Sequence, residues 1–469
     1  MRSDAGGRTG RRSAAATTAQ PAALANPRRV EAQLLAGAVL LTAFAGTLLG
    51  WSESPDLPPA AIVTGVALAV IAIVAHITVR YTAPDADPAL LPLAFLLNGF
   101  GLVFVRRVDL ASGTELAATQ TVWTALTVGL MCAALLFIRS VAPFARYQYT
   151  FGLATIVLLL LPIVPGLTAG VINGAQLWIE LFGMRFQPGE LAKLTGAIFL
   201  AAYLARNRDV LSVATQRIGP LLVPAPRHLA PLFIAAVGAM AIMASLRDLG
   251  SALLFFGTFV AMLYVATGRL AYPAFGLVLF GLASVLAYRL FGHVRVRVHI
   301  WLDPWSDVQD TAYQLAQSLF ALGTGGLTGT GLGFGRPQDV PFSATDAIFV
   351  VIGEELGLLG ATAVLVTYLL LVARGLRIAQ TARDAFSTLL ALGLTVTFAF
   401  QTFVIVGGLT RLMPLTGITL PFISFGGSSL LANYLIIGTL LRISDESRAA
   451  ARGRDGSPAA AAPTGGAGP

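Results

Sequence analysis

The sequence has few charged residues, one lysine and one cysteine. Of its 469 residues, 12% are charged, and Lys193 is the single lysine among thirty-one basic residues. Because a soluble domain carries about 25% charged residues, this composition excludes an ordinary soluble protein. Cys132 is the only cysteine, so no disulfide can form within the chain, and cysteine usage does not indicate a redox compartment.

Apolar residues are abundant instead: they make up 56% of the chain, and the mean hydropathy is +0.77. A helix that spans a bilayer needs roughly 20 apolar residues. On this criterion the sequence predicts an all-α polytopic integral membrane protein with about twelve transmembrane helices. They are expected near residues 33–51, 60–80, 88–105, 118–139, 149–167, 189–206, 228–246, 250–268, 271–291, 346–373, 385–409 and 416–442.

Both ends of the chain lack apolar periodicity. Residues 1–30 are rich in Arg, Ala, Gly and Thr, and residues 446–469 in Arg, Ala, Gly and Pro. Such compositions bury too little apolar surface to fold, so we expect two disordered tails around a transmembrane domain at 31–445. The first apolar segment is long enough to span and no small-residue cleavage signal follows it, which favours a signal anchor over a cleaved peptide.

The arginines predict the orientation. If the N-terminus is cytoplasmic, twenty-one of the thirty arginines fall in cytoplasmic segments and nine outside. This agrees with the positive-inside rule, so we expect a multi-pass protein of the plasma membrane with both termini in the cytoplasm. The polar segment 292–345 then forms a large extracytoplasmic loop. We interpret the positive charge as contact with membrane lipids and not as a nucleic-acid site.

Two charged residues enter a predicted membrane segment. The run FQPGELAKL at 186–194 places a proline in the first turn of a helix, and Glu190 and Lys193 share one face of that helix. A single charge at mid-membrane costs about 2.5–3.5 kcal/mol, so the two opposite charges are expected to pair. The pair is either structural or part of the wall of a polar cavity.

Several sequence blocks together resemble one family. They are FQPGELAKL, preceded by NGAQLWIEL, then RDLGSALLFF at 247–256, DPWSDVQDTAYQLAQSLFALGTGG at 303–326, ATDAIFVVIGEELGLLG at 344–360 and TGITLPFISFGGSSLLANYLIIG at 416–438. Their order and sequence are similar to the SEDS family of shape, elongation, division and sporulation proteins, which includes RodA and FtsW. The resemblance covers most of the chain from residue 170 onward. It implies a family core of about ten spanning helices plus two more at the N-terminus, a layout similar to actinobacterial RodA.

The resemblance also implies an activity. Members of the family polymerise lipid II, a disaccharide pentapeptide on undecaprenyl pyrophosphate, into peptidoglycan strands on the outer membrane face. We therefore expect a peptidoglycan glycosyltransferase for cell elongation and shape, with a class B penicillin-binding protein as partner; a division role stays open. Two other functions also stay open: a flippase for lipid-linked precursors, and a scaffold without chemistry that recruits the transpeptidase.

The resemblance aligns the family's essential carboxylate with Asp307. The role suits the chemistry, because the acceptor's 4-hydroxyl must lose a proton while pyrophosphate leaves the donor. An exposed aspartate is a weak base, so either burial raises its pKa or a divalent cation, Mg2+ or Mn2+ by resemblance, stabilises the diphosphate. The flank VQDTAYQ departs from the family's pattern, so Asp310 or Asp303 could replace Asp307, or all three could simply cap the loop.

Other candidates for substrate binding lie around this carboxylate. Arg295 and Arg297 alternate with valines and would share one face of an extended segment, where they would bind either pyrophosphate or lipid headgroups. Gln314 and Ser318 follow in the same block. The glycine run at 323–335 lacks the ending of a nucleotide-binding loop, so we expect its glycines to permit close backbone approach or hinge motion.

Three acidic residues mark the next predicted helix. Asp346 lies at its start and is either an N-cap or a cavity residue. Glu354 and Glu355 lie farther along, inside the membrane, where a carboxylate needs a cationic partner or a water-filled cavity. The candidate partners are Arg247, Arg411 and Lys193.

The run FGGSS at 425–429 interrupts the last apolar segment. Two glycines and two hydroxyls predict a broken helix that faces protein or water. The amide groups at the restarted helix, together with Ser428 and Ser429, are expected to contact a phosphate.

Overall fold

A computed structural model describes residues 26–52, 59–172, 174–181, 183–212, 216–218, 221–223 and 226–455. Helices dominate this part of the chain. In order they are α1 (Pro27–Trp51), α2 (Pro59–Thr82), α3 (Leu90–Ser112), α4 (Leu116–Phe137), α5 (Ala142–Arg146), α6 (Gln148–Leu160), α7 (Pro188–Ser212), α8 (Pro226–Ser245), α9 (Leu249–Thr267), α10 (Ala271–Leu290), α11 (Gly292–Leu302), α12 (Tyr313–Gly325), α13 (Ile348–Thr381), α14 (Ala385–Leu409) and α15 (Gly427–Asp455).

The described part of the chain contains two short β-hairpins in addition to the predicted helices. β1 (Ile179–Leu181) pairs with β2 (Met184–Phe186), and β3 (Gln216–Ile218) pairs with β4 (Leu221–Val223), each as an antiparallel hairpin. The first hairpin leads directly into α7, and therefore positions the start of that helix.

Eight helices within the described residues are long and apolar enough to cross a membrane: α1, α2, α3, α4, α9, α10, α13 and α14. The structure therefore confirms an all-helical polytopic membrane protein. It does not confirm the number twelve, although each predicted segment contains a helix. α6 ends at Leu160 and continues only as a short 3-10 turn, and α7 carries Glu190 and Lys193 in its first two turns.

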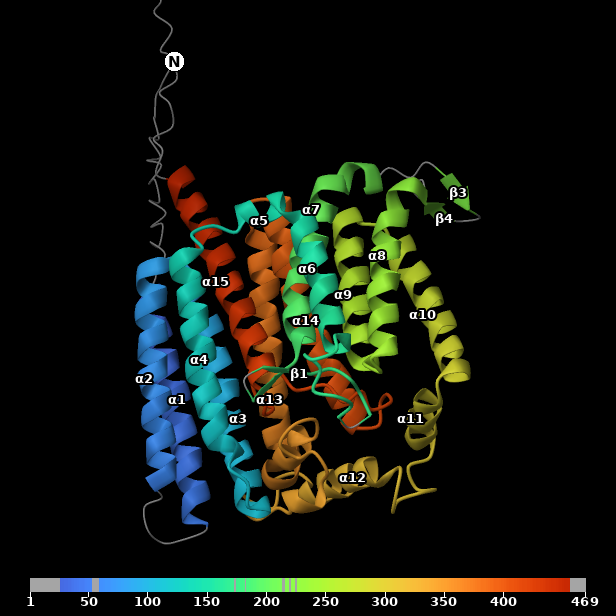
Figure 1. Ribbon diagram of the computed structural model, residues 1–469. Coiled ribbons are helices and arrows are strands. Elements are labelled where there is room, and N and C mark those ends of the chain that lie inside the picture. Colours follow the sequence, from blue (N-terminus) through green and yellow to red (C-terminus); the bar gives the residue numbers. More distant parts are fainter. Residues whose placement is uncertain are drawn as a thin grey trace, which may run out of the picture.

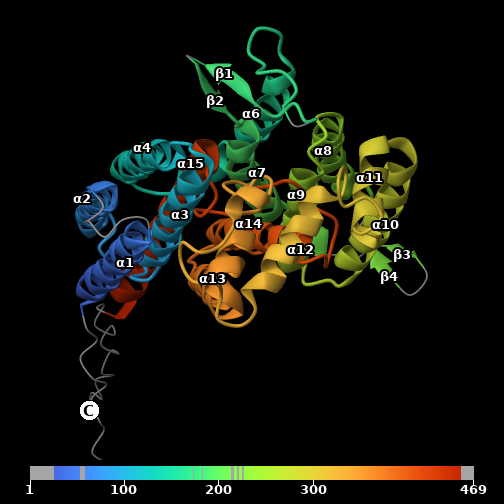
Figure 2. The same cartoon turned by 90° about the horizontal axis from the view of Figure 1, so that it is seen from below.

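Successive long helices run in alternate directions, so the bundle has two ends (Figure 1). We call the end where α1 begins and α15 ends the terminal face. The opposite end, which carries α11, α12 and residues 303–347, is the loop face. The views agree that α1 and α2 form one edge of the bundle and α10 and α11 the opposite edge (Figure 2). The two ends of the described chain and the 292–345 segment thus lie on opposite sides of the bundle, and which side is cytoplasmic stays a prediction.

The last helix differs from the prediction at both of its ends. The predicted span at 416–442 is wrong at its start, because residues 411–426 form turns and irregular backbone before α15 begins. The expected tail boundary at 446 is also wrong, because α15 continues to Asp455. Ion pairs hold this charged end: Arg448 lies 2.8 Å from Asp87, and Glu446 lies 2.8 Å from Arg383. The expected boundary of the first tail at 30 is wrong as well, because α1 begins at Pro27. The remaining predicted tail residues, 1–25 and 456–469, lie outside the described residues.

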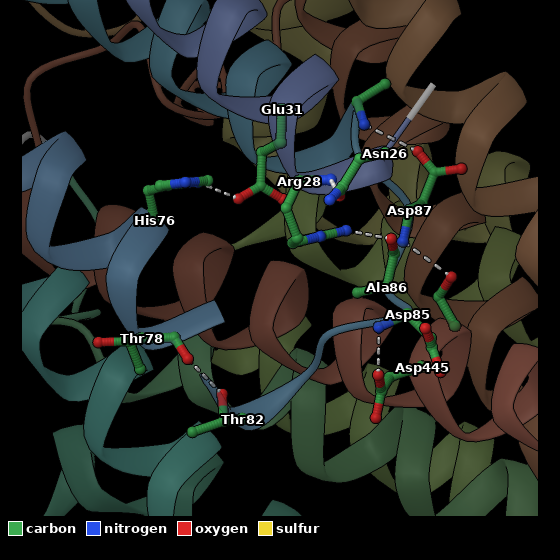
Figure 3. Close-up of polar contacts among 12 residues, drawn as sticks. Asn26, Arg28, Glu31, His76, Thr78, Thr82, Asp85, Ala86, Asp87 and Asp445 are labelled. Atoms are coloured by element: carbon green, nitrogen blue, oxygen red, sulfur yellow. Dashed lines mark hydrogen bonds and ion pairs between the residues drawn. The ribbon is translucent and has the colours of Figure 1, made fainter. Parts of the chain in front are cut away.

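A buried polar network fastens α1 and α2 to the bundle on the terminal face (Figure 3). Arg28 pairs with Glu31 one turn farther along α1, and it donates to a backbone carbonyl between α2 and α3. Glu31 Oε1 lies 2.7 Å from His76 Nδ1 of α2. The amide of Asp85 donates to the Asp445 carboxylate of α15 at 2.8 Å. Polar contacts therefore join α1 to α2 and to the α2–α3 connection, and they join that connection to α15.

We expect Glu31→Gln to destabilise the protein. Glu31 is fully buried, and removing one partner of a buried ion pair typically costs about 3–5 kcal/mol, because the other charge stays buried. Denaturant titration of the purified protein in detergent measures the change in the free energy of unfolding. Glu115→Gln serves as the control, because Glu115 is exposed and its side chain caps no helix. Equal stability of the two variants would contradict this account.

Candidate functional site

A cavity of about 1010 Å³ lies beneath the loop face. Its wall combines residues of α4, the β1–β2 hairpin and α7 with residues of α11, α12 and the 415–429 segment. These elements are distant in the sequence, so the cavity exists only in the folded bundle. A pocket of this size at the meeting point of several helices is the usual position of a ligand site.

Four helices begin at this wall. Gln187, Asp248, Asp346 and Gly427 all line the cavity, and each lies within two residues of the first residue of α7, α9, α13 or α15 respectively. Helix N-termini carry unpaired amide groups and the positive end of the helix dipole. Their convergence favours a ligand with negative charge, such as a phosphate.

The cavity wall also carries charged side chains of both signs. The basic ones are Arg185, Arg247 and Arg297, and the acidic ones are Glu180, Glu190, Asp248 and Asp346. Arg297 donates to the carbonyls of Leu415 at 3.2 Å and Thr416 at 3.1 Å, which anchors α11 to the opposite wall. The guanidinium keeps further N–H groups for a ligand, because it has five donors.

The side chains of Asp346 and Arg297 both lie next to Gly417. Burial raises the pKa of Asp346 to about 6, against the smaller opposing effects of a hydrogen bond with Thr345 and the charge of Arg297. The N-cap alternative for Asp346 is wrong, because Ala347 occupies the N-cap of α13 and no side chain caps that helix. Asp346 is therefore a cavity residue.

Six residues singled out from the sequence meet in this cavity: Glu190, Arg297, Gln314, Asp346, Ser428 and Ser429. The predicted ion pair is also present, since Lys193 Nζ lies 2.7 Å from Glu190 Oε2. Both partners are buried, but Lys193 does not belong to the wall. The structural interpretation is therefore correct for Lys193, and the cavity interpretation is correct for Glu190.

The FGGSS run starts α15 at the cavity, as predicted. Gly427 packs against Trp123 of α4 so closely that a Cβ atom there would overlap the indole ring. Ser428 Oγ accepts from the amide of Gln187 at 2.9 Å, which ties the beginning of α15 to that of α7. The glycine is thus required by close approach, and the serine positions a neighbouring helix start.

Asp307 lies outside the wall. Its carboxylate accepts from the Thr311 amide at 3.1 Å and from Thr311 Oγ1 at 2.6 Å, and these hydrogen bonds lower the pKa of Asp307. Thr311 itself lines the cavity, so Asp307 is at its rim. Asp303 accepts from the amide of Trp305 at 3.2 Å. Both aspartates therefore stabilise local turns, as the alternative interpretation expected.

Arg295 does not join Arg297 in the cavity. The prediction that they share one face is wrong, because α11 is a helix and residues two apart on a helix point about 200° apart. Arg295 is exposed, whereas Arg297 faces the cavity. Ser318 is also outside the wall: it is buried, and its hydroxyl donates to the Gln314 carbonyl within α12 at 2.7 Å.

Glu354 and Glu355 belong to a separate cluster. Glu355 is fully buried and accepts from Arg107 Nε at 2.5 Å and from the Gly333 amide at 2.9 Å. Glu354 accepts from the Arg336 amide at 3.0 Å. These bonds fix the glycine run against α13, so the role is structural here. The sequence predicted Arg247, Arg411 or Lys193 as the cationic partner of these glutamates, and that prediction is wrong. Arg247 donates to the Gly174 carbonyl, Arg411 donates to the carbonyls of Trp301 and Leu302, and Lys193 pairs with Glu190.

The glycine run approaches α13 closely, as predicted. Gly329 has a φ of 83°, and a Cβ atom there would overlap the carbonyl oxygen of Glu355. α13 is itself interrupted at Gly357, where φ is 66°. Only glycine adopts such a backbone without strain, which explains the composition of this segment.

Sequence reasoning missed Asp248 as a site residue. It caps α9 by accepting from the Ser251 amide at 2.9 Å, and burial raises its pKa. The signal was present, because an aspartate directly before an apolar run is an N-cap pattern, but a cap alone does not indicate a cavity.

Comparisons with known proteins agree with one another. Residues 88–449 match the family model of the FtsW, RodA and SpoVE proteins, described as cell cycle protein. A Mycobacterium tuberculosis protein named peptidoglycan glycosyltransferase RodA is 41% identical over 433 residues, which cover 91% of this chain and 92% of the relative. A Geobacter metallireducens protein named probable peptidoglycan glycosyltransferase FtsW is 34% identical over 372 residues, covering 76% and 94%.

A solved structure supports the same fold. It belongs to a peptidoglycan synthase complex and is described as showing the structural coordination of polymerization and crosslinking. The superposition has a TM-score of 0.63 at 26% sequence identity, and covers 77% of this chain and 98% of the other.

The raised pKa of Asp346 predicts a pH-dependent stability. Between about pH 4 and pH 6 the folded protein keeps this proton and the unfolded chain releases it, so Asp346 destabilises the fold increasingly as the pH rises through this window. Asp346→Asn should match the wild type at pH 4 and be more stable above pH 6, by up to about 3 kcal/mol. Thermal unfolding in detergent from pH 4 to pH 7 measures this, with Asp310→Asn on the exposed loop as the control. A less stable Asp346→Asn above pH 6 would refute it.

Proposed function

The chain belongs to the FtsW, RodA and SpoVE family of cell cycle proteins, and from this premise we infer that it is a peptidoglycan glycosyltransferase. We further propose that it polymerises lipid II on the outer face of the cytoplasmic membrane. The observation that carries the proposal is the cavity of about 1010 Å³ beneath the loop face, with its convergent helix N-termini and arginines. A disaccharide diphosphate needs such a polar chamber next to the bilayer.

The diphosphate of lipid II would occupy the basic side of this cavity. Arg297 reaches the wall from α11, and Arg247 and Arg185 reach it from the α8–α9 connection and the β1–β2 hairpin. Guanidinium groups match phosphate oxygens in paired hydrogen bonds, and the helix N-termini add backbone amides. Together they stabilise the charge that develops as the diphosphate leaves.

The polyprenyl tails would leave the cavity along α4. Val122 and Leu126 both line the cavity, yet they are 69% and 48% exposed on the outer surface of the helix. In a membrane protein this surface faces lipid, so one wall of the polar chamber is continuous with an apolar, lipid-facing stripe. A lipid-linked sugar could thus keep its chain in the bilayer and its headgroup in the cavity.

We assign the general base to Asp307. The acceptor's 4-hydroxyl oxygen attacks the donor's anomeric carbon, its proton passes to the carboxylate, and the bond from that carbon to the diphosphate oxygen breaks. The carboxylate would exchange Thr311 for the acceptor hydroxyl. This exchange removes the hydrogen bonds that lower the pKa of Asp307, and so makes it a better base.

A divalent cation, Mg2+ or Mn2+, would accompany the diphosphate. Among the described residues, no group of three His, Cys, Asp or Glu side chains is arranged to hold a metal ion. Mg2+ is usually bound by one or two carboxylates together with phosphate oxygens, and the cavity wall supplies such carboxylates. Asp346 and Asp248 are the carboxylates placed next to the basic wall. The cation would offset charge on the leaving group.

We propose twelve membrane crossings, both termini in the cytoplasm, a role in cell elongation and shape, and a class B penicillin-binding protein as partner. The alternating helix directions and the arginine distribution support the topology. The relative named RodA shares more identity with this chain than the relative named FtsW, which supports the elongation role. The similar solved structure comes from a synthase complex that coordinates polymerization with crosslinking, which supports a transpeptidase partner.

Purified protein supplied with lipid II tests the activity. We expect glycan strands from the wild type, and a loss of about 10²–10⁴-fold in rate for Asp307→Asn, because a general base contributes that much. Asp310→Asn is the matched control and should keep most of the activity. A loss in Asp310→Asn alone would reassign the base. Translocation of lipid II without strands would indicate a flippase, and neither result a scaffold.

Cysteine labelling tests the orientation. Because Cys132 is the only cysteine, Cys132→Ser gives a background without thiols. A membrane-impermeant maleimide applied to intact cells should label Ser306→Cys on the loop face and spare Thr381→Cys on the terminal face, since both positions are exposed. The reverse pattern would place the cavity on the cytoplasmic side and end the proposal.

A further inference from the structure

Lys193 contacts a second residue besides Glu190. Its ammonium group donates to Gln401 Oε1 of α14 at 2.9 Å. Gln401 is 1% exposed and does not line the cavity. Any influence of Gln401 on a ligand must therefore pass through other residues.

The orientation of the Gln401 amide is determined by its neighbours. An ammonium group can only donate hydrogen bonds, so the amide oxygen must face Lys193. The amide nitrogen then donates to the Thr419 carbonyl at 2.7 Å. Thr419 lines the cavity, and its hydroxyl donates to Ser429 Oγ at 3.1 Å, also in the wall. A continuous chain of polar contacts thus runs from Glu190 through Lys193 and Gln401 to Ser429.

We propose that Gln401 is a positioning residue for the glycosyl transfer. It holds the Lys193 ammonium against Glu190, and it holds the 416–429 segment at the correct distance from α7. One buried amide thus links α7 to the 416–429 segment, in addition to the hydrogen bond between Ser428 and Gln187. The inference rests on the proposed function, because it concerns the geometry of the same cavity.

A neutral amide suits this position better than a carboxylate. Glu190 already balances the charge of Lys193, so a second carboxylate would leave a net negative charge in the bundle interior, where uncompensated charges are costly. An ionised carboxylate would also place an acceptor oxygen against the Thr419 carbonyl. A protonated carboxyl group avoids both faults, because its O–H donates as the amide N–H does.

The first test uses Gln401→Met and Gln401→Glu with lipid II as substrate. Gln401→Met removes both hydrogen bonds at similar volume, so we expect kcat to fall about tenfold or more with little change in KM. The activity of Gln401→Glu relative to the wild type should fall as the pH rises and the carboxyl ionises. Thr402→Val is the matched control: the neighbouring Thr402 is buried, and its hydroxyl has no hydrogen-bond partner among the described residues.

The second test does not depend on activity. Because Lys193 is the only lysine, ¹⁵N-lysine labelling of the full chain gives one side-chain ammonium signal. Its chemical shift should move in Gln401→Met and stay in place in Thr402→Val.

Two results would overturn the inference. One is an unchanged ammonium signal in Gln401→Met; the other is a kcat and pH profile of both Gln401 variants that match Thr402→Val. If the wild type makes no strands from lipid II, the proposed function fails instead, and the ammonium signal still decides whether Gln401 holds Lys193.

Discussion

A charge that enters the membrane interior must be compensated by the protein itself, because lipid offers it no hydrogen bonds. This constraint organises the whole bundle. Glu31 meets Arg28 at the edge of the bundle, Glu355 meets Arg107 below the loop face, and Glu190 meets Lys193 beside the cavity. The pairs of Arg28 with Glu31 and of Glu190 with Lys193 neutralise charges within one helix, whereas Glu355 and Arg107 join α13 to α3.

The cavity is the place where this compensation is incomplete. Its wall combines three arginines and four helix N-termini with four carboxylates, and Asp346 is buried enough for its pKa to rise to about 6. Buried charged groups of this kind are stable only if water or a ligand fills the space. The proposed diphosphate would contact the arginines and amide groups and the proposed cation the carboxylates, so the wall suits the proposed glycosyl transfer.

Much of the site could be predicted, and the errors have a common cause. Glu190, Asp346 and the FGGSS run are local signals, since each lies in or just before the first turn of a helix, and the structure brings them together. The prediction for Arg295 was wrong because the residues around it are compatible with either an extended segment or a helix. Gln401 carried no signal, because an isolated glutamine in an apolar helix does not indicate what lies opposite it.

Composition and hydropathy alone determined that this chain is a helical membrane protein, because bilayer thickness sets the length of an apolar segment. The sequence blocks added the family, and the arginine distribution predicted an orientation. Only the tertiary structure decided that Asp307 lies at the rim while Asp346 lies inside, that Glu355 pairs with Arg107, and that α15 extends to Asp455. These outcomes depend on contacts between residues far apart in the chain, and no local pattern specifies such partners.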